Sequence, residues 1–423
     1  MQRITDTVHR HDKSSEIVTM KIASLTPFQF RLATTILYHI LSKEFSIDQS
    51  YSHFFNKVKV VNREQALITR VVGDIMRRLN YFYAVLGINN KNACKHVDRL
   101  VHLWHILNNM QQTHGARTEP LNEDEMRKKI RELKKNKPLV DGCPVWLEEH
   151  GLYELGDDWA AERHALAEAP KRFIRVNTLK ISKEDLIKRL KRSDVQTKEV
   201  DGVDTALEVI SDASLFKLRA FEEGLFEQQD AGSQMIAPFL QTEPGMRVID
   251  ACAGSGGKTL HLAAISKGKG SIIALDTEEW KLKNLKQRAR RDGVFNVETR
   301  VIDSTKVIKR LYNSTDRVLL DVPCSGLGVL KRNPDTKWGD TPSTLSKLYE
   351  LQANILENYS RMVKIGGKLV YSTCSIMPVE NEIQIKVFLK KHKDEFELED
   401  QHTVLPSKTG FDGFYMARLI RIK

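Results

Sequence analysis

The chain has 423 residues, of which 41% are hydrophobic and 29% charged, and its formal net charge is +11. These proportions exclude a fibrous repeat and a chain that is disordered throughout. No apolar run approaches the roughly 20 residues that span a bilayer, and residues 1–15 lack the apolar stretch of a signal peptide. We therefore expect a cytoplasmic protein without membrane contact. The excess of positive charge favours a polyanionic partner such as RNA.

The cysteines are odd in number and widely spaced, and no C-x-x-C pair occurs. They are Cys94, Cys143, Cys252, Cys324 and Cys374. This pattern argues against a disulfide framework and against a zinc site, so we expect no metal. Free thiols also fit the reducing conditions of the cytoplasm.

The first hundred residues predict a helical domain. Apolar residues recur at helical spacing in residues 28–41 and again in residues 63–86. The polar stretch 111–122 contains a glycine and a proline and predicts a linker. We therefore place a helical domain at residues 1–120 and start the next part with a charged helix at 123–135.

Residues 121–225 predict a compact α+β module. Residues 173–178 and 195–200 have strand patterns, and Ser182 followed by Asp185 resembles a capping box that opens a helix over 183–192. This β–α–β unit carries Lys171, Arg172, Arg175 and Lys180. It is either an RNA platform or a structural connector, and the sequence favours neither.

The remaining residues, 226–423, alternate between strand and helix patterns. The expected strands are 247–251, 271–275, 297–302, 317–320, 368–372 and 416–420. Such alternation predicts an α/β domain with a mostly parallel, doubly wound sheet. Ligands of these sheets bind at the carboxyl ends of the strands. The basic helix expected at 278–291 is either a phosphate contact or the solvent face of a helix that covers the sheet.

A glycine-rich turn follows the first strand of this domain. It consists of Cys252, Ala253, Gly254, Ser255, Gly256, Gly257 and Lys258. A P-loop would need glycine where Cys252 stands, and a dinucleotide site would need glycine where Thr259 stands. S-adenosylmethionine is the remaining candidate. Acids that suit this cationic ligand follow successive strands, namely Asp276, Asp303 and Asp321.

Two cysteines, Cys324 and Cys374, come directly after strands on the same edge of the sheet. A single cysteine in such a protein is usually a buried structural residue. Two at ligand-side strand ends, each flanked by small polar residues, indicate chemistry. A thiolate that adds to C6 of cytosine activates C5 toward a methyl group, and a second thiol assists release. Asp321 is positioned to hydrogen-bond the ring, which must first be unstacked.

Together these residues resemble the RNA (cytosine-C5) methyltransferases of the Sun/RsmB and nucleolar NOP type. The resemblance runs from Cys143 to the C-terminus. Its motifs are residues 144–147, 175–179, 226–230, 321–325, 333–335, 337–338, 371–375, 380–382 and 412–414. It implies a Rossmann-like methyltransferase domain after a small RNA-binding module and a NusB-like helical domain, which here is short.

The resemblance also implies residue roles. Cys374 corresponds to the nucleophile and Cys324 to the cysteine needed for product release. The S-adenosylmethionine site corresponds to 252–258 with Asp276, Asp303 and Asp321, and RNA contacts correspond to Arg175, Asn177 and Lys258. The implied substrate is 16S ribosomal RNA or a small-subunit precursor, bound by a monomer.

Alternative functions remain. One alternative is that the substrate is another RNA, such as tRNA or 23S rRNA. A second is that the protein is a non-catalytic RNA-binding factor of ribosome assembly. A DNA cytosine methylase would use the Pro-Cys cysteine, Cys324, as its nucleophile, but the Thr-Cys motif and the upstream module argue against it. A P-loop ATPase is disfavoured by Cys252.

Overall fold

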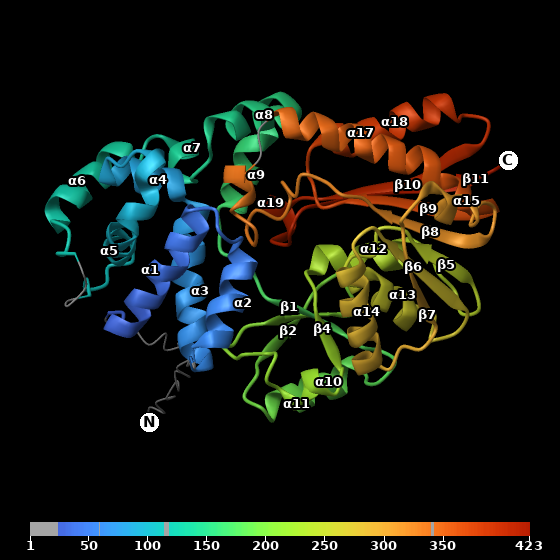
Figure 1. Ribbon diagram of the computed structural model, residues 1–423, viewed down its shortest axis with the longest axis horizontal. Coiled ribbons are helices and arrows are strands. Elements are labelled where there is room, and N and C mark those ends of the chain that lie inside the picture. Colours follow the sequence, from blue (N-terminus) through green and yellow to red (C-terminus); the bar gives the residue numbers. More distant parts are fainter. Residues whose placement is uncertain (1–23, 59, 114–117, 340–341) are drawn as a thin grey trace, which may run out of the picture.

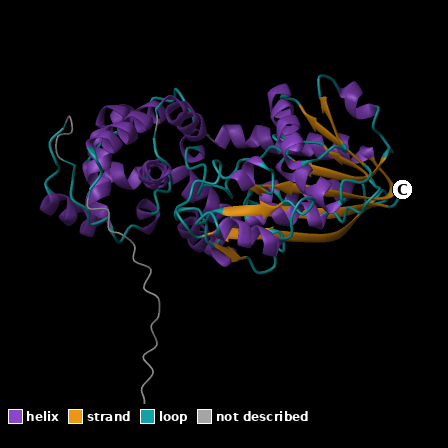
Figure 2. Cartoon of the chain, turned by 90° about the horizontal axis from the view of Figure 1, so that it is seen from below, coloured by secondary structure: helices purple, strands orange, loops and turns teal. Residues whose placement is uncertain are grey.

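The computed structural model of the protein describes residues 24–58, 60–113, 118–339 and 342–423. An all-helical region, blue to teal in Figure 1, forms one end of the molecule, and two sheets lie toward the other end. Figure 2 shows the same division, with the strands confined to one side. This arrangement confirms the predicted α/β class preceded by a helical region.

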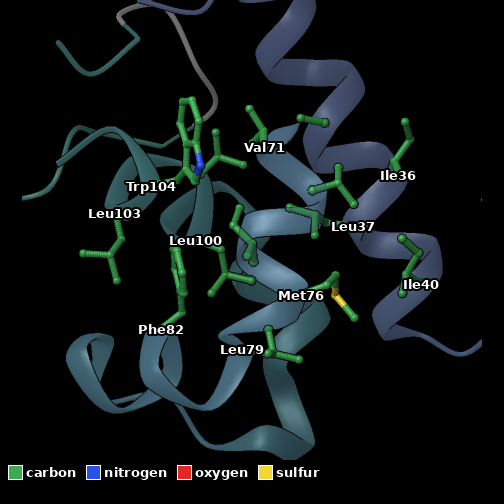
Figure 3. Close-up of a cluster of buried hydrophobic side chains, with 14 of the residues drawn as sticks. Ile36, Leu37, Ile40, Val71, Met76, Leu79, Phe82, Leu100, Leu103 and Trp104 are labelled. Carbon is green, nitrogen blue, oxygen red and sulfur yellow. The ribbon is translucent and has the colours of Figure 1, made fainter. Parts of the chain in front are cut away.

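Helices alone build the N-terminal region. They are α1 Pro27–Leu41, α2 Ile47–Lys57, α3 Asn62–Arg77, α4 Leu79–Leu86, α5 Val97–Leu107, α6 Glu123–Leu133 and α7 Lys137–Val140. Thr26 starts α1 with a capping box that it shares with Gln29. The helices enclose a core that includes Leu37, Val71 and Trp104 (Figure 3). This packing is what the helical spacing of apolar residues predicts.

Met126 of α6 is buried in this same core. The domain boundaries remain predictions, but this contact favours moving the first one from 120/121 to about 142, past α7.

The periodic stretch 63–86 is two helices rather than one, because the chain leaves helical geometry at Arg78. The cause is tertiary. A Cβ atom on Gly142 would lie 2.3 Å from Arg78 Cα, so another part of the chain presses against the break. In addition, Lys337 Nζ donates a hydrogen bond to Arg77 O at 3.0 Å and satisfies a carbonyl at the end of α3.

A small module follows. Its elements are α8 Val145–Leu155, α9 Trp159–Leu166, β1 Phe173–Val176, α10 Lys183–Lys191, β2 Thr197–Glu199, β3 Ala206–Val209, α11 Arg219–Glu222 and β4 Phe226–Gln228. Of these, β1, α10 and β2 match the two predicted strands and the predicted helix, while the other elements were not predicted. Ser182 Oγ accepts from Asp185 N, as the capping pattern predicts. The antiparallel sheet has the order β2-β3-β1-β4. Because β4 belongs to it, this sheet extends past the predicted boundary at 225/226.

The C-terminal domain contains a seven-stranded sheet of order β10-β11-β9-β8-β5-β6-β7. Its strands are β5 Arg247–Asp250, β6 Ser271–Asp276, β7 Val297–Val301, β8 Thr315–Asp321, β9 Val363–Thr373, β10 Phe396–Val404 and β11 Phe414–Arg421. The helices are α12 Ala231–Phe239, α13 Gly257–Ile265, α14 Glu279–Asp292, α15 Thr305–Lys309, α16 Thr336–Gly339, α17 Pro342–Tyr359, α18 Glu382–Lys391 and α19 Pro406–Thr409. Strands β5 to β9 are mutually parallel, which confirms the doubly wound sheet.

Strand β10 was not predicted. It pairs antiparallel with β11 at the edge of the sheet. Its interior is exposed and charged, with buried residues only at its two ends. An edge strand of this kind shows no alternation of apolar and polar residues, so its sequence resembles a loop.

The helical region is joined to the loop between β8 and α16. Arg77 Nη1 donates to Lys331 O at 3.2 Å, and Ile47 N donates to Asp335 Oδ2 at 3.3 Å. The same loop carries the predicted release cysteine, so the N-terminal helices brace a segment of the candidate site. No helix in the described ranges is long and apolar enough to cross a membrane.

Candidate active site

The predicted cofactor turn lies between β5 and α13, at the point where the order of the parallel strands reverses along the sheet. Gly254 and Gly256 have φ of +54° and +90°, which disfavour side chains. At Gly256 a Cβ would lie 2.5 Å from Leu285 Cγ, so glycine also permits close packing there. At Gly254 a Cβ would meet no atom within 4 Å, so the space beside the turn is open to a ligand.

Asp276, one of the acids expected in the S-adenosylmethionine site, lies at the end of β6 beside this turn. Its Oδ2 accepts from Gly254 N and its Oδ1 from Glu278 N, both at 2.8 Å. Each carboxylate oxygen keeps another lone pair for a ligand hydroxyl. Asp303, another acid expected in that site, follows β7 and is exposed, with Oδ1 accepting from Ser304 Oγ at 2.9 Å. The structure therefore brings the glycine turn and Asp276 into direct contact.

Asp250, the last residue of β5, is buried beneath the turn and receives a hydrogen bond from Thr259 Oγ1 at 2.7 Å. Its other oxygen has no hydrogen-bond partner among the described residues. Burial raises the pKa of Asp250 from 3.8 to about 7, against the opposing effect of the Thr259 hydrogen bond. The sequence did not single out this buried acid.

This raised pKa predicts a specific pH dependence of stability. Between about pH 4 and pH 7 the unfolded chain has lost this proton while the folded protein keeps it, so rising pH favours unfolding. We expect this group to lower the free energy of unfolding by up to about 1.4 kcal/mol per pH unit in that window. Asp250→Asn should remove this slope, as measured by urea unfolding across the window. The exposed Asp303→Asn is the control, and an unchanged slope in Asp250→Asn would contradict the prediction.

Asp321 ends β8 and forms an ion pair with Lys258 of the turn. Lys258 Nζ lies 2.7 Å from Asp321 Oδ2, and Ser372 Oγ donates to Asp321 Oδ1 at 3.1 Å. Burial by itself lowers the pKa of Lys258, but the Asp321 carboxylate and then Cys374 outweigh it, so the pKa is raised. Lys258, the last residue of the cofactor turn, therefore stays positively charged and interacts with both Asp321 and Cys374.

The two cysteines meet although they are 50 residues apart in sequence. Cys324 Sγ lies 3.0 Å from Cys374 Sγ and also accepts a hydrogen bond from Cys374 N at 3.2 Å. The hydrogen bond with Cys374, together with burial, raises the pKa of Cys324 well above its ordinary value. Cys324 therefore keeps its proton and can donate it as a hydrogen bond to the Cys374 sulfur.

Glu380 and Asn381, which follow the Thr-Cys motif in sequence, hold the loops that carry Cys324 and Cys374. Glu380 is fully buried and accepts from Ser325 N at 2.8 Å, Ser325 Oγ at 2.5 Å and Gln352 Nε2 at 2.9 Å. Asn381 accepts from Thr373 Oγ1 at 2.6 Å and donates to Ser375 O at 3.0 Å. No role was predicted from the sequence for these two positioning residues, although Glu-Asn-Glu at 380–382 is one of the motifs that carry the family resemblance.

Glycine permits the cysteine loops to touch. Gly328 N donates to Cys374 O at 2.9 Å, and Gly328 O accepts from Gly413 N at 2.7 Å. A Cβ on Gly328 would lie 2.3 Å from Gly413 O, so no other residue fits at this contact.

The expectation that Arg175 and Asn177 contact RNA needs correction. Both side chains are buried, and both are hydrogen-bonded within the protein. Arg175 Nη1 donates to Gly257 O at 2.5 Å and to Gln229 Oε1. Asn177 Nδ2 donates to the carbonyls of Gly224 and Asp292 at 2.7 and 2.9 Å. Burial and internal hydrogen bonds argue against direct contact of either side chain with RNA. Arg175 instead stabilises the cofactor turn through its hydrogen bond to Gly257 O.

Comparison with known proteins agrees with this geometry. Residues 237–420 match the family described as 16S rRNA methyltransferase RsmB/F, and residues 143–215 match an RsmF/B-like ferredoxin-like domain. The probable ribosomal RNA small subunit methyltransferase B of Coxiella burnetii is 31% identical over 292 residues, which cover 66% of this chain and 68% of the relative. The chain belongs to the RsmB/F methyltransferase family.

Other relatives of this family give the same picture and confirm the Sun/RsmB resemblance. The probable ribosomal RNA small subunit methyltransferase B of Synechocystis sp. is 36% identical over 298 residues, and the Yersinia enterocolitica enzyme is 34% identical over 286. The first match covers 65% of this chain and the second 66%, and each covers 66% of the relative. The matches thus span about two thirds of the relatives' length.

Solved structures extend the likeness to the N-terminal helices. The crystal structure of PH0851 has a TM-score of 0.77 and 25% identity, and the match covers 94% of this chain and 99% of that one. A methyltransferase homolog protein from Pyrococcus horikoshii has a TM-score of 0.61 and 29% identity over 68% of this chain and 98% of its own. Because the first match covers nearly the whole chain, the helical region is part of a shared architecture.

Proposed function

We propose that this protein transfers a methyl group from S-adenosylmethionine to C5 of a cytidine in RNA, through a covalent bond between Cys374 and cytosine C6. The observation that carries the proposal is the thiol pair, with Cys324 Sγ 3.0 Å from Cys374 Sγ, beside the Lys258–Asp321 ion pair. The names of the relatives support 16S ribosomal RNA as the substrate. The free thiols and these rRNA-modifying relatives support the cytoplasm as the place of action.

The residues of the turn fit S-adenosylmethionine. Space is open beside Gly254, Asp276 retains lone pairs for hydroxyl groups, and Asp321 supplies negative charge near the sulfonium. A structural neighbour, NSun6 from Pyrococcus horikoshii, was solved with SFG, an analogue of this cofactor, and shares the fold at a TM-score of 0.61 and 24% identity. When bound, S-adenosylmethionine supplies an electrophilic methyl group.

In the proposed reaction the Cys374 thiolate adds to C6 of the unstacked cytosine, and this addition makes C5 nucleophilic. Lys258 interacts electrostatically with Cys374, so a positive charge lies near the proposed nucleophile. Asp321, whose Oδ1 accepts from Ser372, is placed to accept a hydrogen bond from the amino group of the ring, and from N3 once addition at C6 has led to its protonation.

Release is an elimination in which a water molecule takes the C5 proton, the C5–H electron pair re-forms the C5–C6 double bond, and the bond between C6 and sulfur breaks. The sulfur of Cys374 leaves as a thiolate. Cys324 keeps its proton and lies 3.0 Å away, so it can donate a hydrogen bond to that leaving sulfur. Glu380 and Asn381 keep the two loops in register during both steps.

The test is methyl transfer from labelled S-adenosylmethionine to deproteinised 16S ribosomal RNA. We expect 5-methylcytosine in the nucleoside digest and one modified position on mapping. Assembled small subunits, tRNA and 23S RNA serve as parallel substrates, since they represent the alternative RNAs. Binding of S-adenosylmethionine without methylation of any of these RNAs would favour the non-catalytic assembly factor and reject the proposal.

A further inference from the structure

A cavity of about 540 Å³ lies where the ferredoxin-like module meets the catalytic domain. Its volume is in the range of about 300–1,000 Å³ typical of small-ligand sites. The module contributes the loop before α11 and strand β4, and the catalytic domain contributes α14 and the segment around Arg332. The mechanism above uses none of its side chains.

The cavity is electrically balanced. Three arginines line it, Arg288, Arg291 and Arg332, and they are opposite three acids, Glu227, Asp230 and Asp412. Each arginine is already paired. Arg288 and Arg291 bind Glu227, and Arg332 binds Asp230 at 2.8 Å and Asp412 at 2.5 Å. A phosphate group would find no unpaired cation here, so the cavity favours a neutral ligand.

Its remaining surface suits a flat, polar ring. Phe216 is 60% exposed and meets Phe221 edge to face at 5.1 Å, so its ring is available for stacking. Gln228 is exposed on β4, and its amide makes no hydrogen bond among the described residues. Asp412 is buried in the wall, and its Oδ1 has no hydrogen-bond partner there. Sites for single-stranded nucleic acids bind bases by stacking on aromatic rings and by hydrogen bonds from polar side chains such as amides and carboxylates.

The cavity is next to the proposed cytosine site. Phe414 lines it, and Lys258 Nζ lies 5.5 Å from the centre of the Phe414 ring. Two further connections reach the cofactor turn. Arg288 Nη1 donates to Ser255 O at 2.6 Å, and Gln229 of the cavity wall accepts from Arg175, which also holds Gly257 O. A ligand in the cavity would therefore contact the residues that position the catalytic groups.

We propose that this cavity binds the base of a nucleotide adjacent to the target cytidine, stacked on Phe216 and hydrogen-bonded by Gln228. The proposal rests on the proposed RNA methyltransferase function. It assigns the ferredoxin-like module a specific part in substrate selection, namely to hold a neighbouring base while the cytosine is unstacked. The partly exposed arginine stems and Phe221 complete the stacking surface.

The test combines RNA and protein changes in double-mutant cycles. The substrate is a synthetic fragment of 16S ribosomal RNA around the modified cytidine, with the base removed from the nucleotide on either side. We expect one abasic position to lower kcat/KM about tenfold for the wild-type protein, the scale of one lost base–aromatic stack. Phe216→Ala and Gln228→Ala should lower kcat/KM on intact RNA, and their further loss on the abasic RNA should be less than twofold.

Phe295→Ala is the matched control, because Phe295 is 88% exposed and lies outside the cavity. It should behave as wild type on every RNA, and all variants should keep the KM for S-adenosylmethionine. If Phe216→Ala and Gln228→Ala lose as much as wild type on the abasic RNA, the cavity does not hold that base and the proposal is overturned. If wild type methylates no RNA, the proposed function itself fails, which is a different result.

Discussion

Cys374→Ala should abolish methyl transfer, with a loss of more than about 10⁴-fold, the scale on which removal of a covalent nucleophile acts. The reason is that C5 of cytosine reacts only after C6 has been attacked. Cys374 is the proposed nucleophile, and it interacts electrostatically with Lys258. Single-turnover methyl transfer measures the effect, and binding of S-adenosylmethionine should be unchanged.

Cys324→Ala should give a different defect. Attack and methylation proceed, but Cys374 lacks its hydrogen-bond donor at 3.0 Å and leaves slowly. We expect a covalent protein–RNA adduct that survives denaturing electrophoresis and contains methylated cytosine. The control is Cys94→Ala, because Cys94 lies in the helical region away from the site. An adduct in Cys374→Ala, and none in Cys324→Ala, would reverse the two roles.

Loss of the Lys258–Asp321 ion pair should lower the rate of the chemical step about 10² to 10³-fold, as removal of one preorganised electrostatic contact does. Lys258→Met leaves Asp321 without its partner at 2.7 Å and removes the positive charge that interacts with Cys374. Asp321→Asn leaves a largely buried ammonium group unpaired and weakens the hydrogen bond to the cytosine amine. Single-turnover rates with saturating S-adenosylmethionine measure both effects.

The double variant of this pair should lose less than the product of the two single losses, because the two side chains act as a unit. A surface pair provides the control. Lys283 and Glu279 lie 3.1 Å apart on α14, and both side chains are 65% exposed. Lys283→Met should leave the rate unchanged, since exposed ion pairs contribute little. Strictly multiplicative losses in the Lys258 and Asp321 variants would contradict a shared role.

The sequence could indicate most of the site because its signals are local. A glycine turn after an apolar strand, and acids or cysteines at successive strand ends, each occupy fewer than about ten neighbouring residues. In a parallel sheet the carboxyl ends of strands share one edge, so the meeting of Cys324, Cys374 and Asp321 follows from the strand pattern. The β–α–β module and the helical region were likewise visible from periodicity.

Burial and long-range contacts required the tertiary structure. Arg175 and Asn177 are residue types that often bind RNA, but both are buried and donate hydrogen bonds to Gly257 O of α13 and Asp292 O of α14. The periodic stretch 63–86 is interrupted at Arg78, where Gly142 lies against the backbone, and nothing in the local sequence marks that contact. Edge strand β10 lacks the alternation by which strands are recognised.

By itself, then, the sequence determined the class of fold and indicated the glycine-rich turn and the two cysteines as the candidate site, since short motifs and periodic patterns specify these directly. Tertiary structure alone decided three things. It set the 3.0 Å contact between the sulfurs, it brought Glu380 to the Cys324 loop and Asn381 to the Cys374 loop, and it formed the cavity beside Phe216. Each depends on groups from distant segments, and their distances arise only when the sheets, helices and module pack together.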